Sequence, residues 1–151
     1  MNICVDTGFL IGLYSEKNPR VHSKAESLFV QHFNDNIQNK LLVPWPILYE
    51  AVATQMTKSQ KRMEALNRDW KFLYRQGRLE LLDDKPFREK AIDESFDEML
   101  NDPLYYRGLS LTDRVIRNML SDQNLKIDYF ITFNKGDFID ICLRCHRKLL
   151  E

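Results

Sequence analysis

The sequence predicts an α/β fold in which a parallel sheet of about five strands is flanked by helices on both faces. Short apolar runs with the length of buried strands alternate along the chain with longer segments whose apolar residues recur at helical spacing. Strands that are separated in this way by helices are typical of a parallel sheet. At 151 residues the chain has the length of one domain, and we expect residues 1–151 to form it.

The predicted elements follow one another in the order that such a fold requires. The predicted strands cover residues 2–6, 40–44, 78–83 and 127–133. The predicted helices cover residues 23–35, 46–56, 59–75, 86–100 and 110–122. Pro46 is a favoured first residue of a helix, and Gly77 is typical of the position where a helix ends. Residues 138–150 fit either a strand or a helix.

The composition narrows the class of protein. No apolar run approaches the roughly 18 residues of a membrane helix. The N-terminus has no signal-peptide pattern, so we expect a cytoplasmic protein with no membrane partner. Three cysteines are an odd number, which argues against a disulfide framework. The 22 basic and 22 acidic residues cancel, which argues against a tight non-specific binder of nucleic acid.

The charges are nevertheless unevenly spread along the middle of the chain. Residues 58–78 are mostly basic, and residues 80–102 are mostly acidic. Most of these side chains are expected on solvated helix faces. For the basic run, the alternative is a rim that contacts a phosphate backbone.

Four carboxylates stand close to the ends of predicted elements. Asp6 follows the first strand, and Asp137 shares a turn with Asn134 after the last predicted strand. Glu50 and Asp113 are placed in the first turns of two predicted helices. In an α/β sheet these places converge on the carboxyl edge of the strands, where ligands bind.

Taken singly, most of these carboxylates have an ordinary structural explanation. Asp6 is suited to cap a helix that begins at Thr7, and Ser110 with Asp113 fits the capping-box pattern. Asp137 lies in a good turn sequence. Glu50 is less ordinary, because it falls at the edge of an apolar helical stripe rather than opposite it.

Taken together, the carboxylates predict a site for a hard cation. Clustered carboxylates repel one another and any phosphate substrate, and a cation among them reverses both effects. Mg²⁺, or Mn²⁺ in its place, is held by few carboxylates together with water and substrate phosphate. Such an ion activates water and stabilises the charge of a phosphodiester during cleavage.

Four segments in order resemble the PIN-domain nucleases, most closely the VapC-like toxins of toxin–antitoxin pairs. These segments are ICVDTGFLIGLY (3–14), LYEAVA (48–53), LSLTDRVI (109–116) and YFITFNKGDF (129–138). The resemblance covers almost the whole chain, and it implies a PIN-like domain with an acidic metal site that cleaves single-stranded RNA. Roughly residues 58–105 look longer and more charged than the matching part of small toxins of this type.

The resemblance also implies a role for each site residue. Asp6, Glu50 and Asp113 match the first, second and third acids of the family, and they would hold one Mg²⁺ or Mn²⁺, partly through water. Thr7 and Thr112 match the small hydroxyl residues beside these acids.

The fourth family position departs from a pattern of four acids. The family has an aspartate or asparagine within a T-x-[DN] turn, which here begins at Thr132 and places Asn134 at that position. Asp137, three residues further on, is the candidate for a fourth catalytic acid. The departure leaves a one-metal site intact.

The leading hypothesis is therefore a metal-dependent endoribonuclease that cleaves single-stranded RNA with a metal-activated water. The resemblance further implies a cognate antitoxin and a homodimer. The alternative, motivated by Asn134, is a catalytically weak or inactive PIN-like module that binds RNA or protein. A third hypothesis is a metal-dependent phosphohydrolase for small substrates. Residues 142–146, CLRCH, match a haem-attachment pattern, but no export signal accompanies it and we expect no haem.

Overall fold

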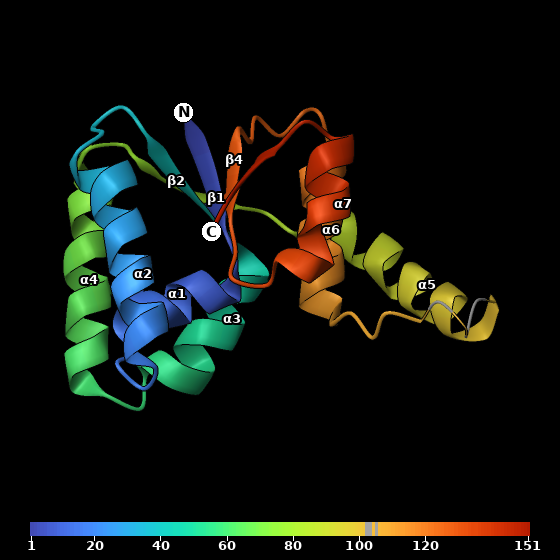
Figure 1. Cartoon of the computed structure of the whole chain (residues 1–151), viewed down its shortest axis with the longest axis horizontal. Coiled ribbons are helices and arrows are strands. Elements are labelled where there is room, and N and C mark those ends of the chain that lie inside the picture. The colour runs from blue at the N-terminus through green and yellow to red at the C-terminus, as the bar shows by residue number, and fades with distance from the viewer. Residues whose placement is uncertain (102–103, 105) are drawn as a thin grey trace.

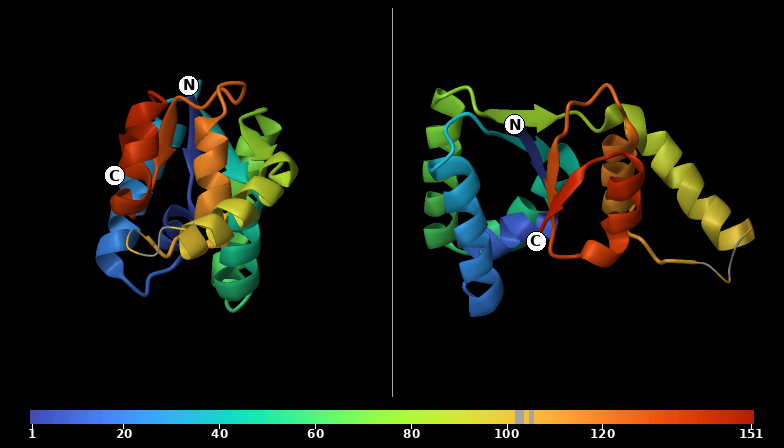
Figure 2. Two further views of the ribbon diagram at one scale, coloured as in Figure 1. Left: turned by 90° about the vertical axis from the view of Figure 1, so that its right-hand side faces the viewer. Right: turned by 45° about the horizontal axis from the view of Figure 1, so that its top comes forward.

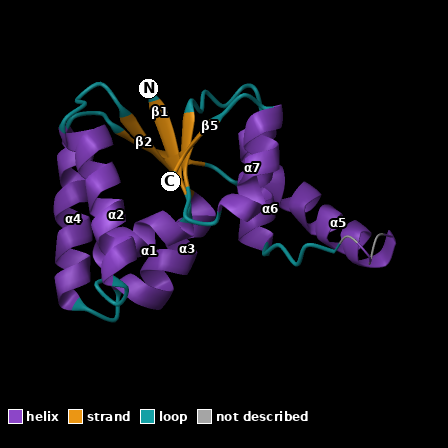
Figure 3. Ribbon diagram, in the orientation of Figure 1, coloured by secondary structure: helices purple, strands orange, loops and turns teal. Residues whose placement is uncertain are grey.

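The computed structural model describes residues 1–101, 104 and 106–151. Within them, five strands form one parallel sheet in the order β3-β2-β1-β4-β5 (Figure 3). The strands are β1 (Asn2–Val5), β2 (Lys40–Pro44), β3 (Leu79–Leu82), β4 (Tyr129–Ile131) and β5 (Lys148–Leu150). The predicted α/β fold with a parallel sheet is confirmed.

Helices cover both faces of this sheet (Figures 1 and 2). The α-helices of the described residues are α1 (Thr7–Tyr14), α2 (Pro19–Phe29), α3 (Trp45–Ala51), α4 (Gln60–Arg75), α5 (Lys85–Asn101), α6 (Leu111–Ser121) and α7 (Lys135–Arg144). Two π-helical turns, η1 (Val30–Asn34) and η2 (Val52–Met56), extend α2 and α3. Helices α2 and α4 lie on one side of the sheet, while α6 and α7 lie on the other with α5 packed outside α6.

The central strand β1 is buried on both faces. Ile3, Cys4 and Val5 have no exposed surface. Ile3 pairs with Leu41 of β2 on one side and Tyr129 of β4 on the other. Strands that are buried on both faces have continuous apolar sequences. This apolar pattern is why β1 and β2 could be predicted from the sequence.

Close packing fixes how α1 crosses the end of the sheet. A side chain at Gly12 would place its Cβ 2.9 Å from Val21 Cγ1 and 3.2 Å from Phe133 Cε2. Only a glycine lets α1 approach α2 and the residues after β4 this closely. Phe9, one turn earlier, is buried beside Phe133 with a ring-centroid distance of 6.2 Å.

The end of α4 agrees with the sequence prediction. Gly77 adopts a φ of 64°, a conformation that favours glycine. Its N–H donates to the carbonyl of Tyr74 at 3.0 Å, and the N–H of Arg78 donates to the carbonyl of Leu73 at 2.9 Å. This pair of bonds is typical of a helix that ends at a glycine.

Several predicted boundaries were wrong. The strand predicted at 127–133 is only β4, because the N–H of Ile127 bonds to the Leu125 carbonyl in a turn. Residues 138–150 contain both alternatives, the end of α7 and then β5. The turn predicted for Asn134 and Asp137 is the start of α7.

The charged segment predicted at roughly 58–105 forms α4, β3 and α5, and its residues 102, 103 and 105 lie outside the described residues. The helix predicted at 23–35 begins earlier, at Pro19, where Asn18 caps it. No helix in the described part of the chain has the length and apolar character needed to cross a membrane.

Candidate active site

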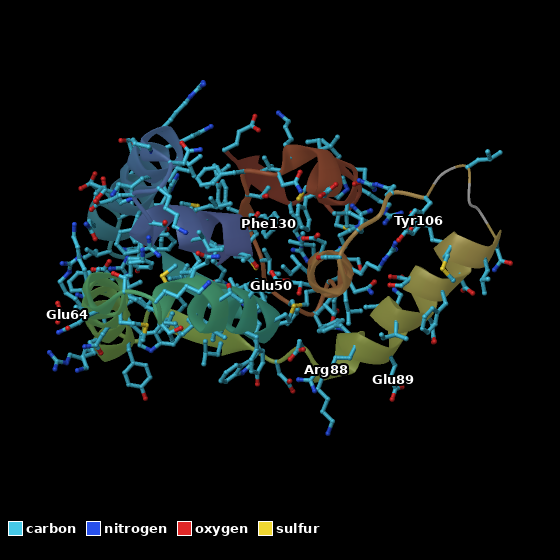
Figure 4. The ribbon with its side chains drawn as sticks, turned by 90° about the horizontal axis from the view of Figure 1, so that it is seen from below. Glu50, Glu64, Arg88, Glu89, Tyr106 and Phe130 are labelled. Carbon is cyan, nitrogen blue, oxygen red and sulfur yellow. The ribbon has the colours of Figure 1, made fainter. Side chains whose placement is uncertain are left out.

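The candidate site residues gather at the carboxyl edge of the sheet. Asp6 follows β1 directly, Thr132 follows β4, and α3 begins immediately after β2. In Figure 1 the strands run toward α1 and α3, and α6 begins on the same side of the molecule. Figure 4 views the molecule from this side, with Glu50 near the centre and Glu64 far out on α4.

Asp6 is buried at the junction of β1 and α1, with only 5% of its surface exposed. Its Oδ1 accepts the N–H of Phe9 at 2.7 Å, so it does cap α1 as its ordinary role requires. Its Oδ2 accepts the hydroxyl of Thr132. Burial raises the pKa of Asp6 to about 6 despite these hydrogen bonds, and the charge of Asp113 adds to the rise.

Thr132 joins Asp6 to the turn after β4. Its side chain is completely buried. The hydroxyl donates to Asp6 and accepts the N–H of Asn134 at 2.9 Å. The two strand ends that meet at this edge are therefore held together by one side chain.

Glu50 lies in the second turn of its helix and not in the first turn as predicted, although α3 begins only one residue before the predicted start at 46. It is the sixth residue of α3, not a member of the first turn. Its half-buried carboxylate accepts the hydroxyl of Thr7 at 2.6 Å between Oγ1 and Oε2. Because Thr7 follows Asp6 in the chain, this bond brings the second acid to the first.

Asp113 lies at the start of α6 in the capping box that the sequence predicted. Ser110 Oγ accepts the N–H of Asp113 at 3.1 Å and donates to Asp113 Oδ2 at 2.7 Å. Burial raises the pKa of Asp113, and the charges of Asp137 and Glu50 raise it further. Thr112 is half-buried beside it.

Asn134 and Asp137 form the fourth part of the site at the start of α7. Asn134 is exposed, and its side-chain amide donates to Asp137 Oδ2 rather than capping the helix. Asp137 is half-buried in the first turn of α7. The asparagine that follows β4 therefore bonds to the acid three residues further along the chain.

The four carboxylates share one electrostatic environment. Asp113 is the common member, since it acts on the pKa of Asp6 and is itself affected by Glu50 and Asp137. In the described residues, however, no three His, Cys, Asp or Glu side chains are arranged to hold a metal ion directly. The donors are all oxygens, and no cation among residues 1–101, 104 and 106–151 pairs with the buried carboxylate of Asp6. The set therefore fits Mg²⁺ or Mn²⁺ with water completing the coordination.

Three charged residues near the site were not identified from the sequence. Arg117 of α6 pairs with Asp140 of α7, with 2.7 Å between Nη2 and Oδ2, and Arg107 pairs with the same carboxylate at 3.2 Å. The available signal was spacing, because Arg117 follows Asp113 by four residues and Asp140 follows Asp137 by three. Helical positions three or four apart share a face.

A large cleft of the described residues lies away from the carboxylates. A cleft of about 920 Å³ lies between α2 and α4, and no predicted site residue lines it. Lys61, Arg62 and Arg68 from the basic run line it together with acidic residues. Lys61 pairs there with Glu16 at 2.7 Å, so part of the basic run is matched by acids of its own chain.

Comparison with solved structures shows a shared fold. This chain resembles one chain in the crystal structure of VapBC2 from Rickettsia felis bound to a DNA fragment from their promoter. The TM-score is 0.55 at 18% sequence identity, over 99% of this chain and 98% of that chain. No family model and no curated protein sequence matches this chain. The likeness therefore establishes the PIN-like fold.

Proposed function

We propose that the carboxyl edge of the sheet is the active site of a metal-dependent endoribonuclease that cleaves single-stranded RNA. The observation that carries the proposal is the gathering of four carboxylates at the carboxyl edge of the sheet, where Asp6 is buried and Thr7 beside it binds Glu50. The charges of Glu50 and Asp137 both act on Asp113, and that of Asp113 acts on Asp6. A buried carboxylate such as Asp6 is costly without a partner. A divalent cation supplies that partner and lets a phosphodiester approach an otherwise repulsive surface.

Asp6, Asp113 and Glu50 are the residues proposed to hold the ion, partly through water. Mg²⁺ or Mn²⁺, when bound, supplies an activated water and neutralises charge on the phosphate. Thr7 orients the carboxylate of Glu50, and Ser110 orients that of Asp113, by the hydrogen bonds described above.

The reaction is a hydrolysis that consumes one water. The water oxygen bonds to phosphorus, the bond from phosphorus to the 3′ oxygen breaks, and one proton ends on the released 3′ hydroxyl. The other proton is released with the phosphate. Asp137, half-buried and hydrogen-bonded by Asn134, is proposed as the fourth catalytic carboxylate at the edge of this site.

The test is cleavage of single-stranded RNA by the purified chain with Mg²⁺, with Mn²⁺ and with EDTA. Asp6→Asn is compared with Asp93→Asn, which alters an exposed carboxylate on α5. The proposal predicts cleavage that needs the ion and Asp6 but not Asp93. Cleavage that persists in EDTA or in Asp6→Asn contradicts it.

The alternative of a module that binds without cutting is favoured by one observation. No three acidic or other ligating side chains of the described residues are arranged for direct metal binding. Calorimetric titration with Mg²⁺ separates the two functions, because the binding module predicts no metal binding. The same chain would then bind single-stranded RNA or protein without cleaving it.

We further propose a cognate antitoxin as a partner. The similar structure is a VapBC2 complex bound to promoter DNA, and the proposal transfers that kind of partner to this chain. It predicts that the neighbouring reading frame encodes a small DNA-binding protein that co-purifies with this chain and suppresses its cleavage of RNA. A neighbouring product that neither binds nor inhibits contradicts the proposal.

Helix α5 supports a second copy of the chain as another proposed partner. Its polar side faces α6, where Glu94 accepts from Asn118 at 3.0 Å. Its exposed side carries the apolar stripe Ile92, Phe96, Met99 and Leu100. Exposed apolar stripes of this kind mark interaction surfaces.

A groove elsewhere on the chain complements this stripe. It has a volume of about 550 Å³ between α3, η2 and α4, and its lining includes Trp45, Leu48, Tyr49, Val52, Met63 and Trp70. We propose that the apolar stripe on α5 of one copy docks into this apolar groove of the other copy.

Sedimentation measures this association. Phe96→Glu is expected to convert a dimer to a monomer, while Phe72→Glu, an exposed aromatic on α4 that does not line the groove, leaves the dimer intact. A wild-type monomer, or a dimer unaffected by Phe96→Glu, contradicts the proposal.

A further inference from the structure

Two arginines converge on the first turn of α7. Arg117 binds the carboxylate of Asp140 with both ends of its guanidinium, at 2.7 Å for each bond, and also donates to the carbonyl of Asp137. Arg107 donates to the carbonyl of Gly136 at 2.8 Å and to Asp140 Oδ2 at 3.2 Å. Two successive backbone carbonyls of α7 are thus bound by side chains from outside the helix.

These contacts matter because α7 begins without a side-chain cap. Asn134 occupies the N-cap position but donates its amide to Asp137, and it makes no capping hydrogen bond. A helix start is ordinarily fixed by such a cap. A carbonyl oxygen has two lone pairs, so it accepts a guanidinium N–H in addition to its helical bond. The two arginines therefore fix the turn that the missing cap leaves free.

One helix supplies both a site carboxylate and the contact that holds another. Asp113 and Arg117 lie four residues apart on α6, which places them on the same face of the helix. Asp113 faces the carboxylate edge, and Arg117 holds the backbone of Asp137 one turn further along. The separation between Asp113 and Asp137 is consequently set by the contact of Arg117 with α7.

A third contact ties the segment before α6 to the same unit. The backbone N–H of Arg107 donates to Glu98 Oε1 of α5 at 2.9 Å, and Arg114 of α6 pairs with Oε2 of the same carboxylate. Arg107 therefore connects α5 and α7 on either side of the chain that leads into Ser110 and Asp113.

We propose that Arg117, assisted by Arg107, is a positioning residue that holds Asp137 and Asn134 at the carboxylate edge through the backbone of α7. This inference rests on the proposed metal site. Arg117 acts through the Asp137 carbonyl, and it touches neither the ion nor the RNA. Its removal moves the first turn of α7 and with it Asp137, whose charge acts on the proposed metal-holding carboxylate of Asp113, and metal binding weakens for that reason. An ordinary ion pair with Asp140 would contribute to stability alone.

The decisive variant is Arg117→Lys, which keeps the positive charge beside Asp140 but cannot bind a carboxylate with two nitrogens and a carbonyl at once. The matched control is Arg88→Lys. Arg88 binds Asp84 through two bonds of 2.8 Å, as Arg117 binds Asp140, but without a contact to a site residue. Figure 4 shows Arg88 on α5, away from Glu50.

Two measurements separate positioning from stability. Titration with Mn²⁺, followed by electron paramagnetic resonance, is expected to show roughly 10-fold weaker binding in Arg117→Lys and wild-type affinity in Arg88→Lys. Amide hydrogen exchange in the absence of metal is expected to accelerate at least about 10-fold at Asn134 and Asp137 in Arg117→Lys only.

The exchange measurement keeps this inference separate from the proposed function. Unchanged exchange at Asn134 and Asp137 in Arg117→Lys overturns the positioning role, whether or not the chain binds metal. Accelerated exchange with unchanged Mn²⁺ affinity also overturns it, because the turn would then move without affecting the site. A wild-type chain that binds no Mn²⁺ overturns the proposed metal site and, with it, this role for Arg117.

Discussion

The carboxylate edge has two halves that the chain builds in different ways. The strand half, Asp6 and Thr132, lies at the ends of β1 and β4 and is buried. The helix half, Asp113 and Asp137, lies at the starts of α6 and α7 and is half-buried. Sheet pairing fixes the strand half, whereas side-chain contacts with backbone carbonyls and carboxylates fix the helix half. The strand half is held rigidly by the core. The helix half depends on single side chains, so we expect single substitutions to shift it.

The largest difference is expected between Asp6→Asn and Asp137→Asn. Asp6→Asn should reduce RNA cleavage at least about 100-fold, because Asp6 is proposed to hold the ion itself and loss of even an outer partner of a metal costs about 10–100-fold. Asp137→Asn should reduce it roughly 10-fold, because Asp137 lies at the edge of the site. Initial rates at saturating Mg²⁺ measure both. Equal losses would show that the halves are equivalent.

Stability should not fall with activity in Asp6→Asn. An asparagine oxygen still accepts the N–H of Phe9, and the cost of burying a charge disappears. Urea denaturation of the metal-free chain is therefore expected to give an unfolding free energy no lower than that of the wild type. A large loss of stability would show that Asp6 serves mainly as the cap of α1.

Thr132→Val should have the next largest effect, on both stability and activity. Valine has a similar shape but leaves Asp6 Oδ2 and the N–H of Asn134 without their partner. Unfolding free energy should fall by about 1–3 kcal/mol, and cleavage should fall roughly 10-fold or more. Thr57→Val, which removes an exposed hydroxyl at the end of η2, is the control. Matching denaturation curves for the two variants would argue against a role of the Thr132 hydroxyl in joining Asp6 to Asn134.

The smallest effect concerns pH and the pair of Arg117 with Asp140. The guanidinium of Arg117 holds the pKa of Asp140 below its ordinary value of 3.8. A lowered native pKa stabilises the fold above pH 3.8, and this contribution is lost as the pH falls through the native pKa. Because Asp140 is half-exposed, Asp140→Asn should cost at most about 1 kcal/mol at neutral pH. The difference from wild type, measured by denaturation, should shrink below about pH 4; a difference that grows there contradicts the assigned sign.

The two halves also differ in how far sequence reasoning reached. Asp6 was placed correctly because Ile3 to Val5 form an apolar run long enough to define a buried strand. The capping box of Ser110 and Asp113 was placed correctly for a similar reason, since its pattern is local. Local patterns thus located one acid in each half.

Contacts between residues far apart in the chain determine two features of the site that the sequence did not reveal. The carboxylate of Glu50 is bound to the site by the hydroxyl of Thr7, 43 residues earlier in the chain. The start of α7 at Lys135 depends on Arg107 and Arg117, which bind it from 29 and 20 residues away. No window of neighbouring residues contains that information.

A calorimetric titration of the metal-free chain with Mn²⁺ tests the proposed metal site at the carboxylate edge most directly. Beside wild type, the titration includes Asp6→Asn and the control Asp93→Asn. We expect one ion to bind per wild-type chain, the same binding in Asp93→Asn, and no measurable binding in Asp6→Asn. A wild-type chain that binds no Mn²⁺, or an Asp6→Asn chain that binds it with unchanged affinity, would contradict the proposal that the carboxylate edge is a metal-dependent active site.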